Sequence, residues 1–108
     1  MHYGLAAAQE AMAEAGLLEE NSAIDPERVG FAIGAGIGGI ATIESTMLLY
    51  RDRGARRVSP FYIPGSIVNM LGGTLSIWYG YKGPNIAVVS ACTTATHNIG
   101  LAARMIRY

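Results

Sequence analysis

The chain has 108 residues, about one small domain, of which 51% are hydrophobic and 15% are charged. This composition excludes an intrinsically disordered chain, because disorder requires low hydrophobicity and high net charge. The eight basic and eight acidic residues cancel, which argues against a nucleic-acid binder held by phosphate contacts.

The charges are distributed unevenly along the chain. All eight acidic residues lie at or before Asp52, and Lys82 is the only Asp, Glu, Lys or Arg over 58–103. We therefore expect residues 58–103 to lie inside a larger molecule or against a partner chain, because a small monomer would expose them to water. A transmembrane helix is not predicted over 58–81, since prolines and a glycine pair interrupt the apolar run. The N-terminus also lacks the pattern of a signal peptide.

Three elements are predicted in the first half of the chain. A helix is expected over Tyr3–Leu18, which is rich in Ala, Leu, Met and Glu. A turn over Asn21–Glu27 leads into a buried strand over Arg28–Ala35. The glycine-rich loop Gly34–Gly39 then opens a second helix over Ile40–Arg53, which ends at a glycine.

The second half repeats the alternation of helix and strand. An extended segment is expected over Arg56–Pro64, followed by a helix over Ser66–Tyr79 with Ser66 as its N-cap. The clearest strand covers Asn85–Ala91, and a final helix runs from Thr93 or Thr94 to the end. Strands that alternate with helices predict an α/β architecture. Two strands are too few for a complete sheet, so we expect only part of a domain.

The loop Gly34–Gly39 matches the letters of the dinucleotide-binding pattern G-x-G-x-x-G. Asp52 lies 18 residues beyond Gly34, near the place of the acid that binds ribose in such folds. That acid must follow a second parallel strand, whereas the residues before Asp52 have a helical pattern. The favoured interpretation is a glycine turn that admits backbone or substrate closely, and nucleotide binding is kept as an alternative.

The only cysteine, Cys92, lies where the predicted strand meets the final helix, and a single cysteine excludes an internal disulfide. Backbone N–H groups at a helix start stabilise a thiolate, and a sharp strand-to-helix turn exposes a nucleophile. The residues alone leave two interpretations, a nucleophile or a small buried side chain. His97 is five residues further on, which is a poor offset for one helix face, so we expect a structural histidine bonded to backbone.

Four arginines surround Asp52 after the second helix, at positions 51, 53, 56 and 57. One interpretation is an exposed helix end, where cations are favoured. The other is a dock for an acidic or phosphorylated partner.

Five sequence blocks together resemble the β-ketoacyl-acyl carrier protein synthases, and most closely the chain-elongating type II class of bacterial fatty acid synthesis. The blocks are 34–39, 58–64, 67–70, 83–85 and 91–100, in the family's order and spacing. The resemblance implies a thiolase-like fold, layered α-β-α-β-α. Residues 1–108 would form part of its N-terminal half, incomplete at both ends.

The resemblance also implies a reaction. Cys92 would take an acyl group from acyl carrier protein, and malonyl-acyl carrier protein would lose CO₂ and attack the thioester in a Claisen condensation. Backbone N–H groups, that of Cys92 included, would hold the oxyanion. No metal or redox cofactor is implied. Two histidines and a lysine that assist decarboxylation in the family would lie beyond Tyr108, so residues 1–108 alone are not expected to catalyse condensation.

Further residues are carried over from the same resemblance. Ile37, Tyr62 and Ala91 would line the acyl pocket, with Tyr62 reaching in from the partner subunit. Arg56 and Arg57 would meet the acidic carrier protein, and the strand over 85–91 would pair with its copy in a homodimer. A reduced cysteine without a signal peptide predicts a cytoplasmic protein. A polyketide ketosynthase, a type I synthase, and a non-catalytic dimerisation or docking module stay open as alternatives.

Overall fold

The computed structural model describes residues 1–19 and 23–108, in which five α-helices and two short strands are formed. None of the described helices is long and apolar enough to cross a membrane. Three short 3-10 helices, η1 to η3, link these elements. The bounds are α1 His2–Glu14, η1 Pro26–Arg28, β1 Phe31–Ala32, α2 Ile40–Arg53, η2 Ala55–Arg57, α3 Tyr62–Ser66, α4 Met70–Tyr79, β2 Asn85–Ile86, η3 Ala91–Thr93 and α5 Thr94–Arg107.

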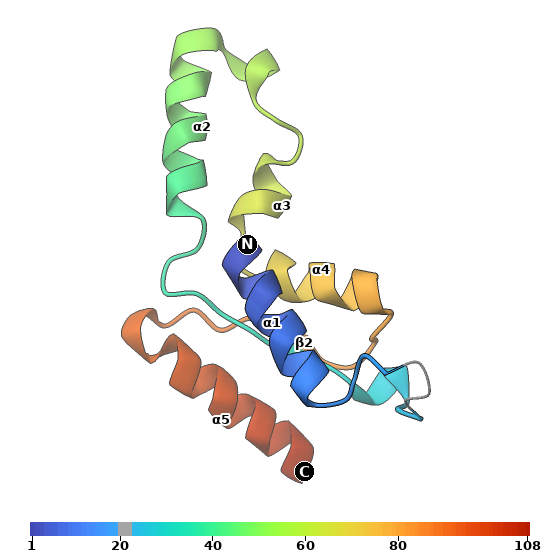
Figure 1. The fold of residues 1–108 in the computed structure, drawn as a ribbon. Coiled ribbons are helices and arrows are strands. Elements are labelled where there is room, and N and C mark those ends of the chain that lie inside the picture. The colour runs from blue at the N-terminus through green and yellow to red at the C-terminus, as the bar shows by residue number, and fades with distance from the viewer. Residues whose placement is uncertain (20–22) are drawn as a thin grey trace.

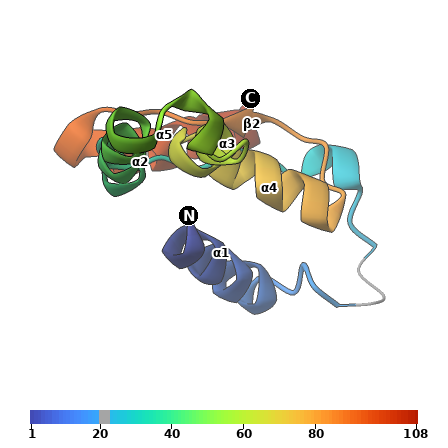
Figure 2. The same ribbon diagram turned by 90° about the horizontal axis from the view of Figure 1, so that it is seen from above.

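The two strands are parallel, with Phe31 opposite Asn85 and Ala32 opposite Ile86. Parallel neighbours require a crossover connection, and α2, α3 and α4 lie within this one. The strands run between α4 and α5 (Figure 1). Helix α1 lies on one side of the layer that the other elements form and packs on α4 (Figure 2). The predicted alternation of helices and strands is therefore confirmed, in a helix-dominated domain.

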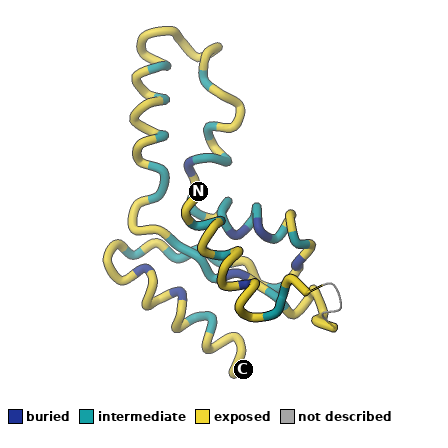
Figure 3. The backbone as a smooth tube through the Cα atoms, in the orientation of Figure 1, coloured by how far each residue is buried: buried dark blue, intermediate teal, exposed yellow. Residues whose placement is uncertain are grey.

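The core consists of Met12, Phe31, Leu75 and Tyr81, which come from α1, β1, α4 and the segment before β2. The Tyr81 hydroxyl donates a hydrogen bond of 2.7 Å to the carbonyl of Leu17, so the segment that follows α1 is tied to this core. Figure 3 shows that the buried positions gather around the strands, α4 and α5. The core is small for a chain of this length.

Residues 40–66 form an arm that projects away from the strands (Figure 1). Its surface is mostly exposed (Figure 3), and the exposed side chains include Met47 and Phe61, at 64% and 76%. The radius of gyration is 16.1 Å, whereas a compact domain of this length has about 13 Å. Much apolar surface is thus left uncovered by the described residues.

The predictions for 56–79 are partly wrong. The segment expected to be extended instead forms η2 and the short helix α3. Pro64 is tolerated there because it lies in the first turn, where backbone N–H groups lack intrahelical acceptors. Ser66 ends α3 instead of capping the next helix, since its hydroxyl donates to the carbonyl of Tyr62 at 2.8 Å. Helix α4 consequently begins only at Met70.

Both strands are shorter than predicted, because pairing between them is confined to two residues each. The predicted turn over 21–27 lies partly outside the described residues. Its described end is capped by Asp25, whose carboxylate accepts a 2.9 Å hydrogen bond from the N–H of Glu27 at the start of η1.

Candidate active site

Cys92 lies in η3, directly between the segment that follows β2 and helix α5. It is a free, exposed cysteine. The preceding residue, Ala91, has φ 50°, the only positive φ among the described non-glycine residues. A residue with a β-carbon pays about 1 kcal/mol or more for this conformation. The junction is therefore a sharp, strained turn that presents the cysteine side chain to the outside.

Ser90 connects this turn to the start of α5. Its carbonyl accepts hydrogen bonds from the N–H and the hydroxyl of Thr93, at 3.1 and 2.8 Å. Its N–H donates to the hydroxyl of Thr94 at 2.9 Å. The predicted helix start at Thr93 or Thr94 is confirmed, but both hydroxyls bind Ser90 and neither caps the helix.

His97 makes its hydrogen bond to a side chain, where a backbone partner was expected. Its Nδ1 lies 2.6 Å from the hydroxyl oxygen of Ser90. This bond agrees with the prediction that His97 has a structural role. The predicted backbone partner is wrong, because the partner is a side chain. This hydrogen bond occupies one of the two ring nitrogens of His97.

Asn98 is a site residue whose role sequence reasoning missed. Its side chain is only 4% exposed, and it donates to the carbonyl of Thr94 at 2.9 Å and also bonds Val88. The available signal was an asparagine one turn after Thr94, on the face of the helix that meets the strand. A buried amide needs partners, and only the fold shows that they are Thr94 and Val88.

The glycine loop packs closely against this junction. A β-carbon at Gly34 would collide with the carbonyl of Val88 and would lie 2.5 Å from Nδ2 of Asn98. Gly39 donates a 3.0 Å hydrogen bond to the carbonyl of Ser66 on the other side of the loop. The prediction of a turn that allows close approach is thus confirmed. Asp52 lies within α2, not after a second strand, so the nucleotide-binding alternative lacks the element it requires.

Ile37 and Tyr62, two of the predicted acyl-pocket residues, line one hollow of about 460 Å³. Neither Ala91 nor Cys92 is part of its lining. Ala91 lies beside the glycine loop, since a β-carbon at Gly36 would be 3.6 Å from its carbonyl oxygen. The hollow is otherwise lined by residues of α2, α3, the segment after α3 and the segment after β2: Ile43, Ile63, Ser66, Ile67, Val68, Asn69, Ala87 and Val89.

A second apolar groove, of about 490 Å³, runs along the arm between α2 and the returning chain, and Tyr62 borders it too. Tyr62 and Ile43 therefore each border both spaces. Arg56 and Arg57 are exposed in η2, at the tip of the arm (Figure 1). Arg51 is paired with Asp52 at 3.0 Å on the helix before them.

The model of the beta-ketoacyl synthase N-terminal domain matches residues 1–108. The chain belongs to this family. It is 52% identical to a 3-oxoacyl-[acyl-carrier-protein] synthase 2 of Vibrio cholerae, over 100% of this chain and 26% of that protein. The protein of the same name from Vibrio harveyi is 53% identical over the same shares. A mitochondrial 3-oxoacyl-[acyl-carrier-protein] synthase of Arabidopsis thaliana is 44% identical over 98% of this chain and 23% of its own length.

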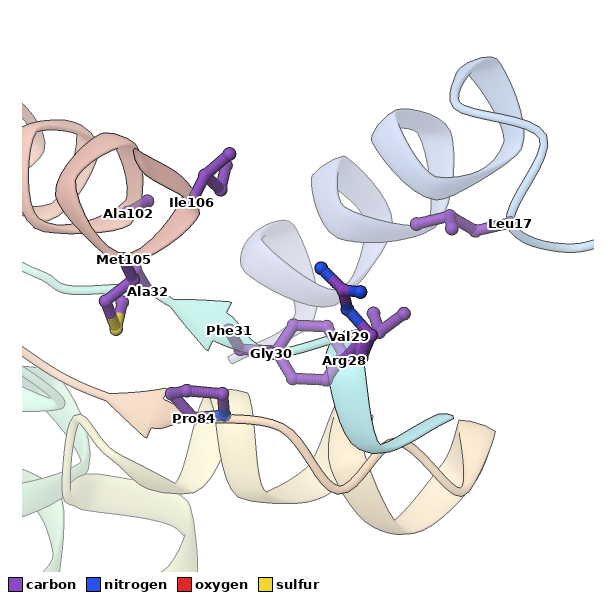
Figure 4. A pocket seen from close by; sticks show the side chains of 10 residues that line it. All are labelled: Leu17, Arg28, Val29, Gly30, Phe31, Ala32, Pro84, Ala102, Met105 and Ile106. Carbon is purple, nitrogen blue, oxygen red and sulfur yellow. The ribbon is translucent and has the colours of Figure 1, made fainter. Parts of the chain in front are cut away.

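The chain thus spans about a quarter of the length of the curated relatives it matches. The structure also has a third hollow, of about 470 Å³. Figure 4 shows it beside β1, with Phe31 and Val29 on one side and Ala102, Met105 and Ile106 of α5 on another. Its lining is mainly apolar, with Arg28 as the charged member, and none of the described residues fills it.

Proposed function

We propose that the protein is a 3-oxoacyl-acyl carrier protein synthase of fatty acid elongation, and that Cys92 is its nucleophile. The observation that carries the proposal is the exposed cysteine directly after the left-handed Ala91, at a strand-to-helix junction of a chain in this family. A nucleophile elbow has this geometry. The names of the relatives supply the substrate class.

We further propose that residues 1–108 are part of the N-terminal half of a thiolase-like, layered α-β-α-β-α fold. Two observations support this. The relatives are about four times as long as the matched region. The apolar hollow beside β1 and the uncovered arm leave surface that further strands and helices would bury.

The reaction follows from a thiolate at Cys92. The sulfur attacks the carbonyl carbon of an acyl thioester, and the thiol of the carrier protein leaves with the proton that the cysteine gave up. Malonyl-acyl carrier protein then loses CO₂, and the resulting carbanion attacks the carbonyl of the acyl-Cys92 thioester. A carbon–carbon bond forms, the bond to sulfur breaks, and the thiolate returns. Backbone N–H groups at the turn, that of Cys92 included, would stabilise both oxyanions.

We propose that the acyl chain occupies the hollow at Ile37, with Ala91 across the glycine loop and with Tyr62 of a second copy of the chain reaching in at the far end. Its lining supports this, because it is mainly aliphatic and about 460 Å³ in volume. Tyr62 also borders the groove of the arm, which suits a residue at the far end of the chain. The length of acyl chain accepted would depend on this side chain.

Two macromolecular partners are proposed, acyl carrier protein and a second copy of the chain. Arg56 and Arg57 would dock the acidic carrier protein, and their exposure at the tip of the arm supports this. Residues 85–91 would pair with their copy, which agrees with a strand β2 that has one neighbour among the described elements. We place the protein in the cytoplasm, where a nucleophilic cysteine stays reduced.

The test uses the native polypeptide, incubated with acyl-acyl carrier protein and then with malonyl-acyl carrier protein. The mass of the polypeptide should rise by one acyl group, and digestion should place that group on the peptide that contains Cys92. The second step should yield the 3-oxoacyl product and CO₂. Cys92→Ala should abolish both, whereas Thr96→Ala, an exposed change on α5, should keep both. Full product formation by Cys92→Ala would disprove the proposal. Binding of carrier protein without acylation would favour a docking module.

A further inference from the structure

We propose that Ser90 and His97 are positioning residues, a clamp that holds the Cys92 turn in its reactive orientation. The inference rests on the proposed role of Cys92 as nucleophile. It concerns a side-chain pair on either side of the cysteine, two residues before it and five after it, and assigns no direct contact with substrate to either residue.

All the polar groups of Ser90 are engaged by the start of α5. Its N–H donates to the Thr94 hydroxyl at 2.9 Å and its carbonyl accepts from the Thr93 hydroxyl at 2.8 Å. Its own hydroxyl lies 2.6 Å from Nδ1 of His97. Ser90 cannot rotate without breaking several hydrogen bonds at once. Its N–H, its carbonyl and its hydroxyl therefore all hold the residue before the turn in place.

This fixation matters because the next residue is strained. Ala91 has φ 50°, and its β-carbon makes this conformation unfavourable by about 1 kcal/mol or more. An unsupported turn would relax toward a negative φ. The backbone of Ala91 determines where Cys92 lies, so relaxation would move the sulfur away from its exposed position just before α5.

The hydrogen bond from Ser90 to His97 spans more of the sequence than the bonds to the threonines. Thr93 and Thr94 lie three and four residues after Ser90, so their bonds close the turn on itself. His97 lies seven residues after Ser90, in the second turn of α5, so its bond fixes the direction of the helix relative to the incoming segment. The hydroxyl can donate to a neutral ring or accept from a protonated one, so the contact does not require one protonation state.

A small displacement of a nucleophile is sufficient to slow a reaction strongly. An error of ~1 Å in the position of a reacting group costs on the order of 100-fold in rate. Since Ser90 and His97 act on geometry and not on binding, their loss should lower kcat for acyl transfer and leave KM nearly unchanged. Since both act through one bond, removing both should cost no more than removing either.

The experiment measures acyl transfer and the alkylation rate of Cys92 by iodoacetamide in the native polypeptide. Ser90→Ala and His97→Phe should each lower kcat by roughly 10-fold to 100-fold, with KM within about twofold and slower alkylation. Ser90→Thr, which keeps the hydroxyl, should restore kcat to within about threefold. The double variant Ser90→Ala/His97→Phe should match the slower single variant.

Unchanged kcat and alkylation in Ser90→Ala, or equal loss in Ser90→Ala and Ser90→Thr, would overturn the clamp. Multiplied losses in the double variant would do the same, because they would mean separate roles. A different result would contradict the proposed function, namely acyl transfer by the Cys92→Ala variant. Alkylation by iodoacetamide needs no carrier protein, so it tests the clamp even in a protein that transfers no acyl group.

Discussion

Asn98 and Val88 are joined by two hydrogen bonds, from the N–H of Val88 to Oδ1 of Asn98 at 3.3 Å and from Nδ2 of Asn98 to the carbonyl of Val88 at 3.1 Å. This is the pattern by which one strand residue pairs with a neighbouring strand. Pairing with the β1 segment reaches only Ile86, whose carbonyl accepts from Ile33. The side chain of Asn98 therefore takes the place of a strand neighbour on the way to Cys92.

Replacing Asn98 by Ala should destabilise the native protein substantially. The N–H and carbonyl of Val88 would both lose their partners in a half-buried place, and each unsatisfied group costs about 1–3 kcal/mol. Denaturant unfolding measures the difference. Asn69→Ala is the matched control, because Asn69 is exposed and makes no capping bond at the start of α4, so its effect should stay within about 0.5 kcal/mol. Equal stability of the two variants would contradict the role given to Asn98.

Gly34 and Gly100 provide a second matched pair. Gly34→Ala should prevent stable folding or displace α5, because its β-carbon would collide with the carbonyl of Val88 and crowd Asn98. Gly100→Ala on α5 meets no atom within 4 Å, and alanine is favoured over glycine in a helix by about 1 kcal/mol, so it should raise the melting temperature. Circular dichroism melts of both variants check this. A Gly34→Ala protein as stable as the native one would show that the loop is not closely packed.

Local patterns were enough to predict much of this fold. The bounds of α2 agree with the prediction, because the helix ends at Gly54 with φ 77°, a conformation that suits glycine. The start of α5 and the position of Cys92 at the strand-to-helix junction also agree.

The errors have a common cause in tertiary contacts. The β pattern over 85–91 yields only two paired residues, because the strand partner ends and Asn98 replaces it. Helix α3 forms around Pro64 in a segment whose prolines favoured extension. The bond from Ser90 to His97 spans seven residues, and no periodicity of the sequence indicates it. Functional candidates were found from motifs, whereas their supporting residues required the fold.

A substitution at Leu75 tests whether the small core controls the stability of the protein. It is 1% exposed and packs with Met12, Phe31 and Tyr81. Leu75→Ala should destabilise the protein by about 2–5 kcal/mol, since it removes buried methyl groups and leaves a cavity. Ile77 is two residues further on in α4 and is 77% exposed, so Ile77→Ala should have little effect unless another chain segment covers it. Comparison of the two unfolding midpoints therefore also reports whether that face of α4 is buried in the native polypeptide.

Variants of Arg56 and Arg57 should separate docking of the carrier protein from the reactivity of Cys92. Reversing both to Glu at the tip of the arm replaces attraction to an acidic partner by repulsion, and 1.4 kcal/mol already corresponds to tenfold. We expect the Kd for acyl carrier protein to rise at least about tenfold at low salt, while alkylation of Cys92 by iodoacetamide is unchanged. The double reversal Arg104→Glu/Arg107→Glu gives the same change in net charge at the exposed end of α5 and should bind normally. Equal weakening by both double variants would mean that overall charge attracts the carrier protein, and the arm would then have no special role.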